Sequence, residues 1–487
     1  MRIFGKGEKK AEDGFEVDVE AVDPNNAEKV DAVYGAADEG GPHYNHMGWM
    51  RAAVVQAKAQ IGLGVLGIPS VMNTLGLVPA ILIILLIAIM STSAMFIIGK
   101  FKINHPNVHS IGDVGMMWWG PIGRETFGFI YLLYMVMSAG SGYLSISIAL
   151  NSLSLHAKCT VIFVVVGAIM AGLLASIQTL EKVAILGWGG LISIISAVIT
   201  LTIAVGVAGP ADAPAGADLG IVNFASPTFA EAASAVGTIL FSFGATPAFF
   251  NVVAEMRNPK DYWKSALGGQ LLATGMYIII GSVVYEFAGT YVASPALGTA
   301  GVVMKRVCYG LAFPALIASS TLFTHFSAKY IFIRILRGSK HLSANTPQHW
   351  AAWIGSVLIA TVCAYVIADG IPVFNGLISL VGSILGAPIG LMCMGGMWLY
   401  DNLSSRHNLS SKNYIYYLSA SWAVFLIIGG AFITVAGSYG AIEGIISDYA
   451  VSPGRVQLSS HFAFLEFALT QKSFLLQSFS CADNSSS

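Results

Sequence analysis

The chain has 487 residues, of which 55% are hydrophobic and 10% are charged, and its formal net charge at pH 7 is −1. Soluble domains carry about 25% charged residues, so this composition excludes an ordinary soluble domain and a basic protein that binds nucleic acid. It indicates an all-α polytopic membrane protein that is surrounded by membrane lipid.

The first 46 residues are polar and acidic, and no apolar stretch precedes Trp49. They predict a disordered cytoplasmic tail at 1–46 without a cleavable signal peptide, so we expect the first span to act as its own insertion signal. The lysines of this tail are Lys6, Lys9, Lys10 and Lys29. They are candidate targets of a ubiquitin ligase, and the alternative is a solvated tail without that role.

Eleven windows of about 20 residues are apolar enough to cross a bilayer. They lie at about 51–75, 78–100, 125–150, 159–178, 184–208, 232–254, 264–289, 306–335, 351–369, 374–400 and 414–437. Together they predict a transmembrane domain at 47–437 and a tail at 438–487.

The distribution of Lys and Arg predicts the orientation of these spans. If the amino terminus is cytoplasmic, the inner loops hold thirteen such residues, whereas the outer loops hold only Lys158, Lys305 and Arg306. By the positive-inside rule, we expect the amino terminus in the cytoplasm and the carboxyl terminus outside the cell.

The five cysteines, at 159, 308, 363, 393 and 481, show no paired spacing. Four of them lie in or beside predicted spans. They are therefore expected to be small buried side chains, with neither a disulfide framework nor a bound metal.

The segment from Lys58 to Ser70 interrupts the first span with three glycines and Pro69. Backbone groups freed from a helix within the hydrocarbon cost several kcal/mol each, so an unwound stretch persists only where it lines a cavity. In secondary transporters, such interrupted helices form the substrate site.

A second interruption lies five spans later, at 239–250, where Gly244 and Pro247 break the sixth span. Interrupted segments in corresponding positions of two halves are typical of an inverted repeat with its site at the interface. The sequence thus predicts repeat one at about 50–208, repeat two at about 232–400 and an eleventh span at about 414–437. Each interruption taken alone could be an ordinary kink, because Gly and Pro are common in membrane helices.

Two motifs carry a resemblance to a known family. They are Gly48-Trp49 followed by Lys58 and by Gln-Ile-Gly-Leu-Gly-Val-Leu-Gly-Ile-Pro at 60–69, and Phe-Ser-Phe-Gly-Ala-Thr-Pro-Ala-Phe-Phe-Asn-Val-Val-Ala-Glu-Met-Arg-Asn-Pro at 241–259. Over roughly 46–445, the chain resembles the amino acid/auxin permease family, closest to its fungal neutral amino acid permeases of the methyltryptophan-resistance type. The resemblance implies a leucine-transporter-like 5+5 inverted repeat with discontinuous helices 1 and 6. It also implies uptake of neutral amino acids driven by an ion gradient, most often of protons.

An amino acid zwitterion needs hydrogen-bond donors for its carboxylate and acceptors for its ammonium, and broken helices supply both. The residues expected to bind it are Gly62, Gly64 and Gly67 in the first span, Ser242, Phe243, Gly244 and Thr246 in the sixth, and Tyr134 and Ser138 in the third. The aromatic residues near the second break, of which Phe243 is favoured, predict an apolar pocket for a large neutral side chain. In the alternative interpretation, the glycines only let helices approach closely.

Ionisable residues inside spans are candidates for ion coupling. Lys58 lies before the first break and Glu255 ends the sixth span. We hypothesise that the two form part of an inner gate, or that one exchanges the coupling proton. The alternative is that Glu255 pairs with Arg257 or Lys260 at the membrane surface.

The eighth span offers a second set of candidates. His325 titrates near neutral pH, although a single histidine in a helix often only bonds a neighbour. Ser319, Ser320 and Thr321 could complete an oxygen-lined Na⁺ site, although hydroxyls in membrane helices often bond their own helix. The sequence therefore leaves the coupling ion open between H⁺ and Na⁺.

The carboxyl-terminal tail departs from the family pattern at about 453–478. This segment is either a translated retained intron or a real amphipathic segment. Function is not expected to depend on it.

The motifs of other function classes are missing from the sequence. It has no His-Glu-x-x-His, no Gly-x-Ser-x-Gly turn and no nucleotide-binding loop, so we expect neither an enzyme nor an ATP-driven pump, and no cofactor besides the coupling ion. We expect a neutral amino acid permease of the plasma membrane, where the closest branch of the family acts. The alternatives are an amino acid sensor on the same fold and a vacuolar exporter.

Overall fold

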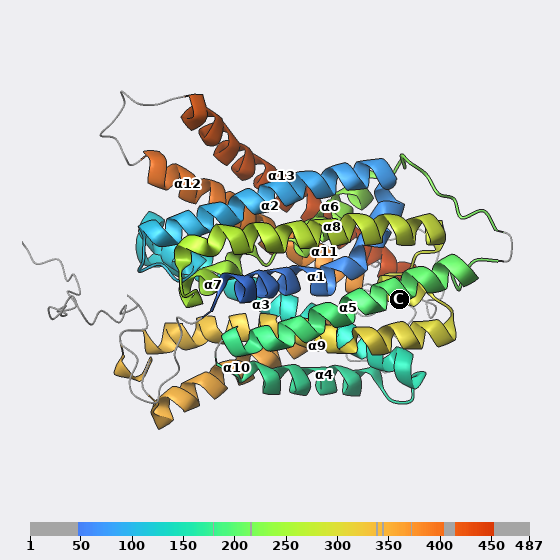
Figure 1. The fold of residues 1–487 in the computed structure, drawn as a ribbon, viewed down its shortest axis with the longest axis horizontal. Coiled ribbons are helices and arrows are strands. Elements are labelled where there is room, and N and C mark those ends of the chain that lie inside the picture. The colour runs from blue at the N-terminus through green and yellow to red at the C-terminus, as the bar shows by residue number, and fades with distance from the viewer. Residues whose placement is uncertain are drawn as a thin grey trace, which may run out of the picture.

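The computed structural model describes residues 47–451 except 179, 215–216, 338, 343–344, 372 and 404–413. The predicted tail at 1–46 and the segment at 453–478 lie outside the described residues. The described part is built of helices (Figure 1).

In chain order the helices are α1 (Trp49–Leu75), α2 (Leu77–Asn104), α3 (Ile111–Ser154), α4 (Thr160–Ala175), α5 (Leu180–Ala208), α6 (Phe229–Ser242), α7 (Phe249–Glu255), α8 (Tyr262–Ala288), α9 (Val302–Leu336), α10 (Pro347–Gly370), α11 (Phe374–Leu380), α12 (Cys393–Leu403) and α13 (Tyr414–Val451). A short 3₁₀ turn, η1 (Thr246–Ala248), joins α6 to α7, and two π-helical turns, η6 (Val381–Gly386) and η7 (Pro388–Met392), join α11 to α12.

Each of the eleven predicted windows falls on one of these helices or on a helix pair. Within the described residues, ten segments are long and apolar enough to cross a membrane, and α4 is a shorter apolar helix. The prediction of an all-α polytopic membrane protein is confirmed. The last helix, α13, extends to Val451, beyond the predicted end of the eleventh span at about 437.

Four of the helix contacts join spans that lie five apart along the chain. Helix α1 packs against α6, α2 against α8, α3 against α9 and α4 against α10, so each of the first four spans contacts the span that follows it by five. Because five is an odd number, corresponding spans cross the membrane in opposite directions, as an inverted repeat requires. Helix α13 lies outside this repeat, against α6 and α12.

Of the two predicted interruptions, only the second breaks its helix. The sixth span ends as α6 at Ser242 and resumes as α7 at Phe249, whereas α1 continues unbroken from Trp49 to Leu75 with Pro69 inside it. The predicted discontinuity of helix 1 is therefore wrong for this structure. Proline removes one backbone donor from a helix, and membrane helices tolerate that loss.

The glycines of α1 serve close packing rather than unwinding. A Cβ atom built on Gly64 would lie 2.6 Å from the Cα of Ser242, and one built on Gly67 would lie 2.9 Å from Ile378. Small residues of this kind let membrane helices approach each other closely. In this structure the glycines of α1 therefore fit the alternative interpretation, in which they only let helices approach closely.

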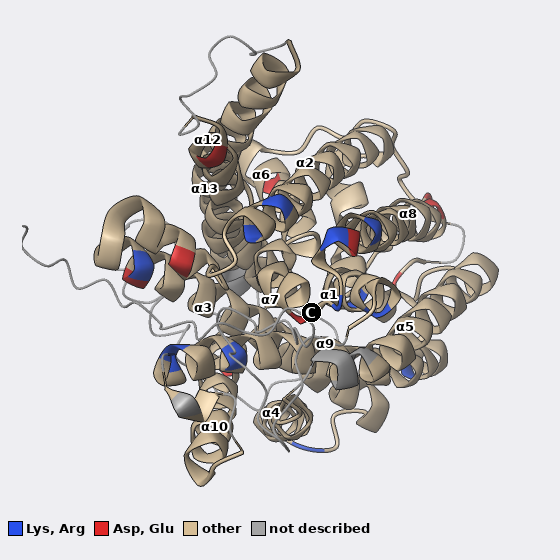
Figure 2. Cartoon of the chain, turned by 60° about the vertical axis from the view of Figure 1, so that its left-hand side comes forward, with Lys and Arg blue, Asp and Glu red and all other residues tan. Residues whose placement is uncertain are grey.

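The charged residues are few along the helical ribbon, most of which carries neither sign (Figure 2). Those buried within the spans therefore stand out. Lys58, Glu255 and Lys329 are each at most 2% exposed. Burial of a charge is costly unless a partner compensates it, so each of these residues needs a specific local explanation.

The cysteines depart in two respects from the expectation of small buried side chains. Cys308 and Cys393 are buried and free, and Cys363 is exposed and free. Cys159, just before α4, is disulfide-bonded, so the prediction that no disulfide forms is wrong there. A disulfide requires proximity in space, which the spacing of cysteines along the chain does not reveal.

The contact at Gly64 gives a stability test. In Gly64→Ala the new Cβ would lie 2.6 Å from Ser242, and such overpacking costs about 1–3 kcal/mol. We expect a lower melting temperature of the purified protein, measured by size-exclusion chromatography after heating. The control is Gly275→Ala on α8, where no atom lies within 4 Å of the added Cβ. Equal melting temperatures for the two variants would contradict the close approach.

Candidate functional site

The broken sixth span replaces its lost helical hydrogen bonds with side-chain donors. The carbonyl of Ser242, at the end of α6, accepts a 2.8 Å hydrogen bond from the hydroxyl of Tyr277 on α8. The carbonyl of Phe243 accepts one of 3.1 Å from the hydroxyl of Thr246, which also bonds Ser91 of α2 at 3.1 Å. Because freed backbone groups need partners within a membrane, these contacts stabilise the break.

Helix α3 contributes one predicted residue directly to the break. A Cβ atom built on Gly244 would lie 1.8 Å from the hydroxyl oxygen of Tyr134, so the ring of Tyr134 fits only because residue 244 is a glycine. Ser138 lies one turn further along α3, where its hydroxyl donates to the carbonyl of Tyr134 at 2.8 Å. The structure therefore brings Tyr134 to Gly244 and turns the Ser138 hydroxyl onto its own helix.

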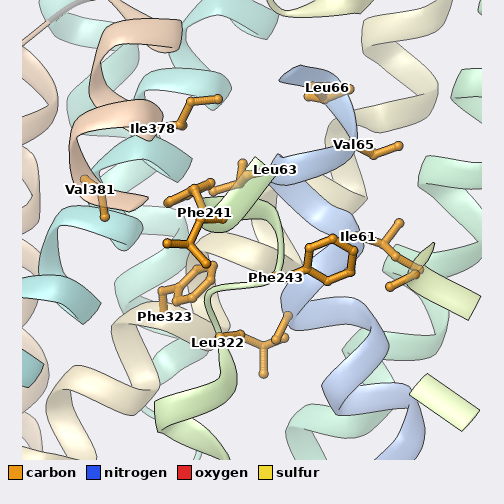
Figure 3. Packing of buried hydrophobic residues seen from close by; sticks show 14 of the residues in the cluster. Ile61, Leu63, Val65, Leu66, Phe241, Phe243, Leu322, Phe323, Ile378 and Val381 are labelled. Carbon is orange, nitrogen blue, oxygen red and sulfur yellow. The ribbon is translucent and has the colours of Figure 1, made fainter. Parts of the chain in front are cut away.

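The aromatic side chains divide between two sides of the break (Figure 3). Phe241 lies with Leu63 of α1 and Phe323 of α9 on one side. Phe243 lies on the other side, near Ile61, and its ring makes an edge contact with Tyr277 at 5.0 Å. Phe243, the ring expected to line the substrate pocket, is thus packed between α1 and α8. Phe241 instead lies beside Leu63 of α1 and Phe323 of α9.

A polar cavity of about 420 Å³ reaches the α1–α6 contact where α1 ends and α6 begins. It lies between α1, α6, α11 and α13, and its lining includes Ser70, Thr74, Glu231, Thr238, Asn375 and Glu443. Thr238 also lies 3.0 Å from a Cβ built on Gly67. The cavity therefore ends at the close contact between Gly67 of α1 and Thr238 of α6, next to the residues expected to bind the substrate.

Lys58 is completely buried, and its ammonium donates to the hydroxyl of Ser319 on α9. Two glycines leave room for its side chain. A Cβ built on Gly62 would lie 2.6 Å from its Nζ, and one built on Gly190 of α5 would lie 2.7 Å from its Cε. Lys58 therefore points toward α5 and α9, so the structure does not bring it to Glu255, the other residue of the hypothesised inner gate.

Glu255 forms a buried ion pair with Lys329 of α9. Its backbone carbonyl also accepts a 3.0 Å hydrogen bond from the amide of Met47, whose own carbonyl accepts one of 2.9 Å from the amide of Arg257. This contact ties the start of α1 to the end of α7 and to α9. The sequence places Lys329 among the inner-loop cations although it falls within the predicted eighth span at about 306–335, and it does not single Lys329 out as a partner of Glu255.

The other candidates on α9 have separate surroundings. The Ser320 hydroxyl donates to the carbonyl of Leu316 at 2.7 Å on its own helix, while the Thr321 hydroxyl is buried without a hydrogen-bond partner in the described part of the chain. His325 lies 3.4 Å from the carbonyl of Ala175 on α4, and its ring contacts Trp353 on α10. His325 therefore faces α4 and α10, away from the break.

Comparison with known proteins identifies the family. The model of the family described as transmembrane amino acid transporter protein matches residues 45–442. The chain belongs to this family of amino acid transporters. The match covers both predicted interruptions and every span except the end of α13.

Individual relatives agree with this assignment. The chain is 34% identical over 402 residues to a transmembrane transporter of Gibberella moniliformis, covering 82% of this chain and 84% of the relative. It is 31% identical over 445 residues to a transmembrane transporter of Fusarium pseudograminearum, covering 91% and 92% of the two chains. It is 30% identical over 420 residues to the N amino acid transport system protein of Neurospora crassa, covering 85% and 88%.

The ion pair between Glu255 and Lys329 gives a second test. Glu255→Gln leaves a buried ammonium without its counter-charge, and breaking such a pair costs about 3–5 kcal/mol. We expect a large loss of thermal stability in the purified protein, and partial recovery when Lys329→Met is added.

The control is Asp261→Asn, which removes the more exposed pair between Asp261 and Lys264. Surface pairs contribute at most about 1 kcal/mol, so this variant should melt close to the wild type. A similar loss in both single variants would contradict the special role of the buried pair.

Proposed function

We propose that this amino acid transporter imports neutral aliphatic and aromatic amino acids by proton symport through alternating access. The observation that carries the proposal is the contact of α1 with the broken sixth span, on a helix that also holds the buried Lys58. The broken span supplies uncharged hydrogen-bonding groups, and the lysine supplies a group that can exchange a proton.

The substrate assignment follows from the groups at the break. The turn at Phe243, Gly244 and Ala245 joins the end of α6 to η1, so backbone donors and acceptors meet there. Such groups suit the carboxylate and ammonium of a zwitterion. Around the substrate side chain, Leu63, Phe241 and Phe323 offer apolar surface (Figure 3). A cationic or acidic side chain would find no opposite charge in this set of three, which favours a neutral one.

The coupling assignment rests on Lys58 and Ser319. Their contact joins α1 to α9, and a transporter that alternates its access must change the packing of such helices. A proton released from Lys58 would weaken this contact, which links protonation to conformation. An ammonium at this position also repels Na⁺, so the proposal favours H⁺ although Ser319 and Thr321 offer oxygen atoms.

The proposed location is the plasma membrane, with the amino terminus in the cytoplasm and the carboxyl terminus outside. The excess of Lys and Arg in the inner loops supports this orientation. In the same orientation the 1–46 tail would present its lysines to a cytoplasmic ubiquitin ligase. A vacuolar exporter and an amino acid sensor are the alternatives, and the relative named as an amino acid transport system protein favours transport over sensing.

Uptake measurements test the substrate and the ion. We expect a permease-deficient yeast that expresses the chain to concentrate radiolabelled leucine, phenylalanine and tryptophan, but not lysine or glutamate. A protonophore should abolish this uptake, and removal of Na⁺ should leave it unchanged. With surface expression verified, absence of uptake across the panel would refute the import proposal in favour of a sensor or an exporter.

Replacement of Lys58 tests the coupling. Lys58→Gln keeps a donor for Ser319 but removes the titrating charge. One pH unit of proton gradient is worth about 1.4 kcal/mol, or about a ten-fold concentration ratio, so wild-type accumulation should rise strongly as the outside pH falls. We expect the variant to lose both the accumulation and its dependence on pH.

The control is Lys264→Gln, which changes a partly exposed lysine at the start of α8. It should accumulate substrate as the wild type does. The coupling assignment would be abandoned if Lys58→Gln kept wild-type accumulation at every pH while its expression was normal.

A further inference from the structure

A groove of about 800 Å³ opens on the surface between α2, α12 and α13. Helix α12 packs against both neighbours and forms its floor. The walls are apolar and aromatic, and Ile89 and Phe96 of α2 and Phe425 of α13 are 41–57% exposed. Figure 1 shows α12 and α13 diverging on this side of the molecule.

Two charged residues, Lys100 of α2 and Asp401 of α12, line the groove. The carboxylate of Asp401 already accepts a 2.9 Å hydrogen bond from the amide of Asn104 and forms one of 2.7 Å with the ring of His105. Lys100 is exposed and has no hydrogen bond or ion pair within the described part of the chain. The ammonium of Lys100 is therefore available to a molecule bound in the groove, and an anionic group would compensate its charge.

We propose that this groove binds an anionic glycerophospholipid, with an acyl chain along the apolar walls and its phosphate headgroup at Lys100. All three helices are membrane spans, so the groove opens toward lipid. In the proposed orientation Lys100 faces the cytoplasm, and anionic lipids are concentrated in the cytoplasmic leaflet. A sterol has no phosphate for Lys100, and a zwitterionic lipid brings a cationic amine with its phosphate, so neither supplies the net negative charge that an anionic lipid does.

The groove is also connected to the broken sixth span through α2. Ile89 and Ser93 line the groove, whereas Ser91 between them bonds Thr246 of the break at 3.1 Å. Trp422 of α13 donates a 2.9 Å hydrogen bond from its indole to Ser93. A lipid held between α2 and α13 therefore contacts the helix that supports the break, and we expect it to raise the rate of transport. This last step rests on the proposed transport function.

Binding is tested without transport, by native mass spectrometry of the purified full chain with phosphatidylserine or phosphatidylcholine. A lysine near an anionic lipid surface contributes about 1 kcal/mol, so the wild type should retain phosphatidylserine about five-fold more strongly. Lys100→Gln should lose this preference, whereas Lys264→Gln, on a lysine outside the groove, should keep it. Equal retention of the two lipids by the wild type, or an unchanged preference in Lys100→Gln, would overturn the proposal.

A second variant tests the place of the acyl chain. Ser421 lines the groove and is exposed, so Ser421→Phe should fill the groove, lower retention of both lipids and leave the fold intact. In proteoliposomes, wild-type transport should increase with the phosphatidylserine fraction and Lys100→Gln transport should not. Unchanged lipid retention in Ser421→Phe would overturn the groove as the binding site. Absent transport together with the expected lipid retention would refute the proposed function but not the lipid site.

Discussion

The structure depends on one contact, that between α1 and the broken sixth span. Gly64 carries no side chain, so the backbones of α1 and α6 approach closely at Ser242. Where α6 then ends, its carbonyls need new donors, because the membrane interior offers no water. Tyr277 and Thr246 provide them. Tyr277 belongs to α8, which reaches the break because it packs along α1. Glycines on α8 make that possible, since a Cβ on Gly269 would lie 3.1 Å from the backbone of α1.

The positions of the apolar helices, the break at Gly244 and the placement of the α1 glycines beside the sixth span could be predicted from sequence, although α4 is shorter than the other predicted spans. Apolar length determines a membrane span almost by itself, and a Gly-x-x-Pro segment removes helical hydrogen bonds at a definite position. The continuity of α1 could not be predicted in the same way. Glycines serve both unwinding and close packing in membranes, and the sequence does not distinguish these uses until the neighbouring helix is placed.

The partners of the buried charges were beyond prediction for a related reason. The position of a residue along a span predicts its depth in the membrane but not the direction of its side chain, and the partner of a buried charge depends on both. Lys58 and Gly62 are four residues apart and share one face of α1, and this face is directed to α5 and α9. Phe243 shows the same limit, because it lies beside the break in sequence yet its ring contacts Tyr277 on the opposite side from Phe241.

Lys58 and Lys329 are both buried within spans, and under the proposed proton symport the difference between their partners decides which of them could carry the coupling proton. Lys329 is compensated by the carboxylate of Glu255, so removal of its proton would leave a buried negative charge, which is costly. Lys58 instead donates to the neutral hydroxyl of Ser319, so its deprotonation leaves no charge behind and removes one that is expensive to bury. The pair of Glu255 and Lys329 is therefore suited to holding α7 against α9, and in the proposed transport cycle Lys58 is suited to changing its protonation when the contact between α1 and α9 changes. This difference in partners, rather than depth in the membrane, distinguishes the structural ion pair of Glu255 and Lys329 from the coupling site that we propose at Lys58.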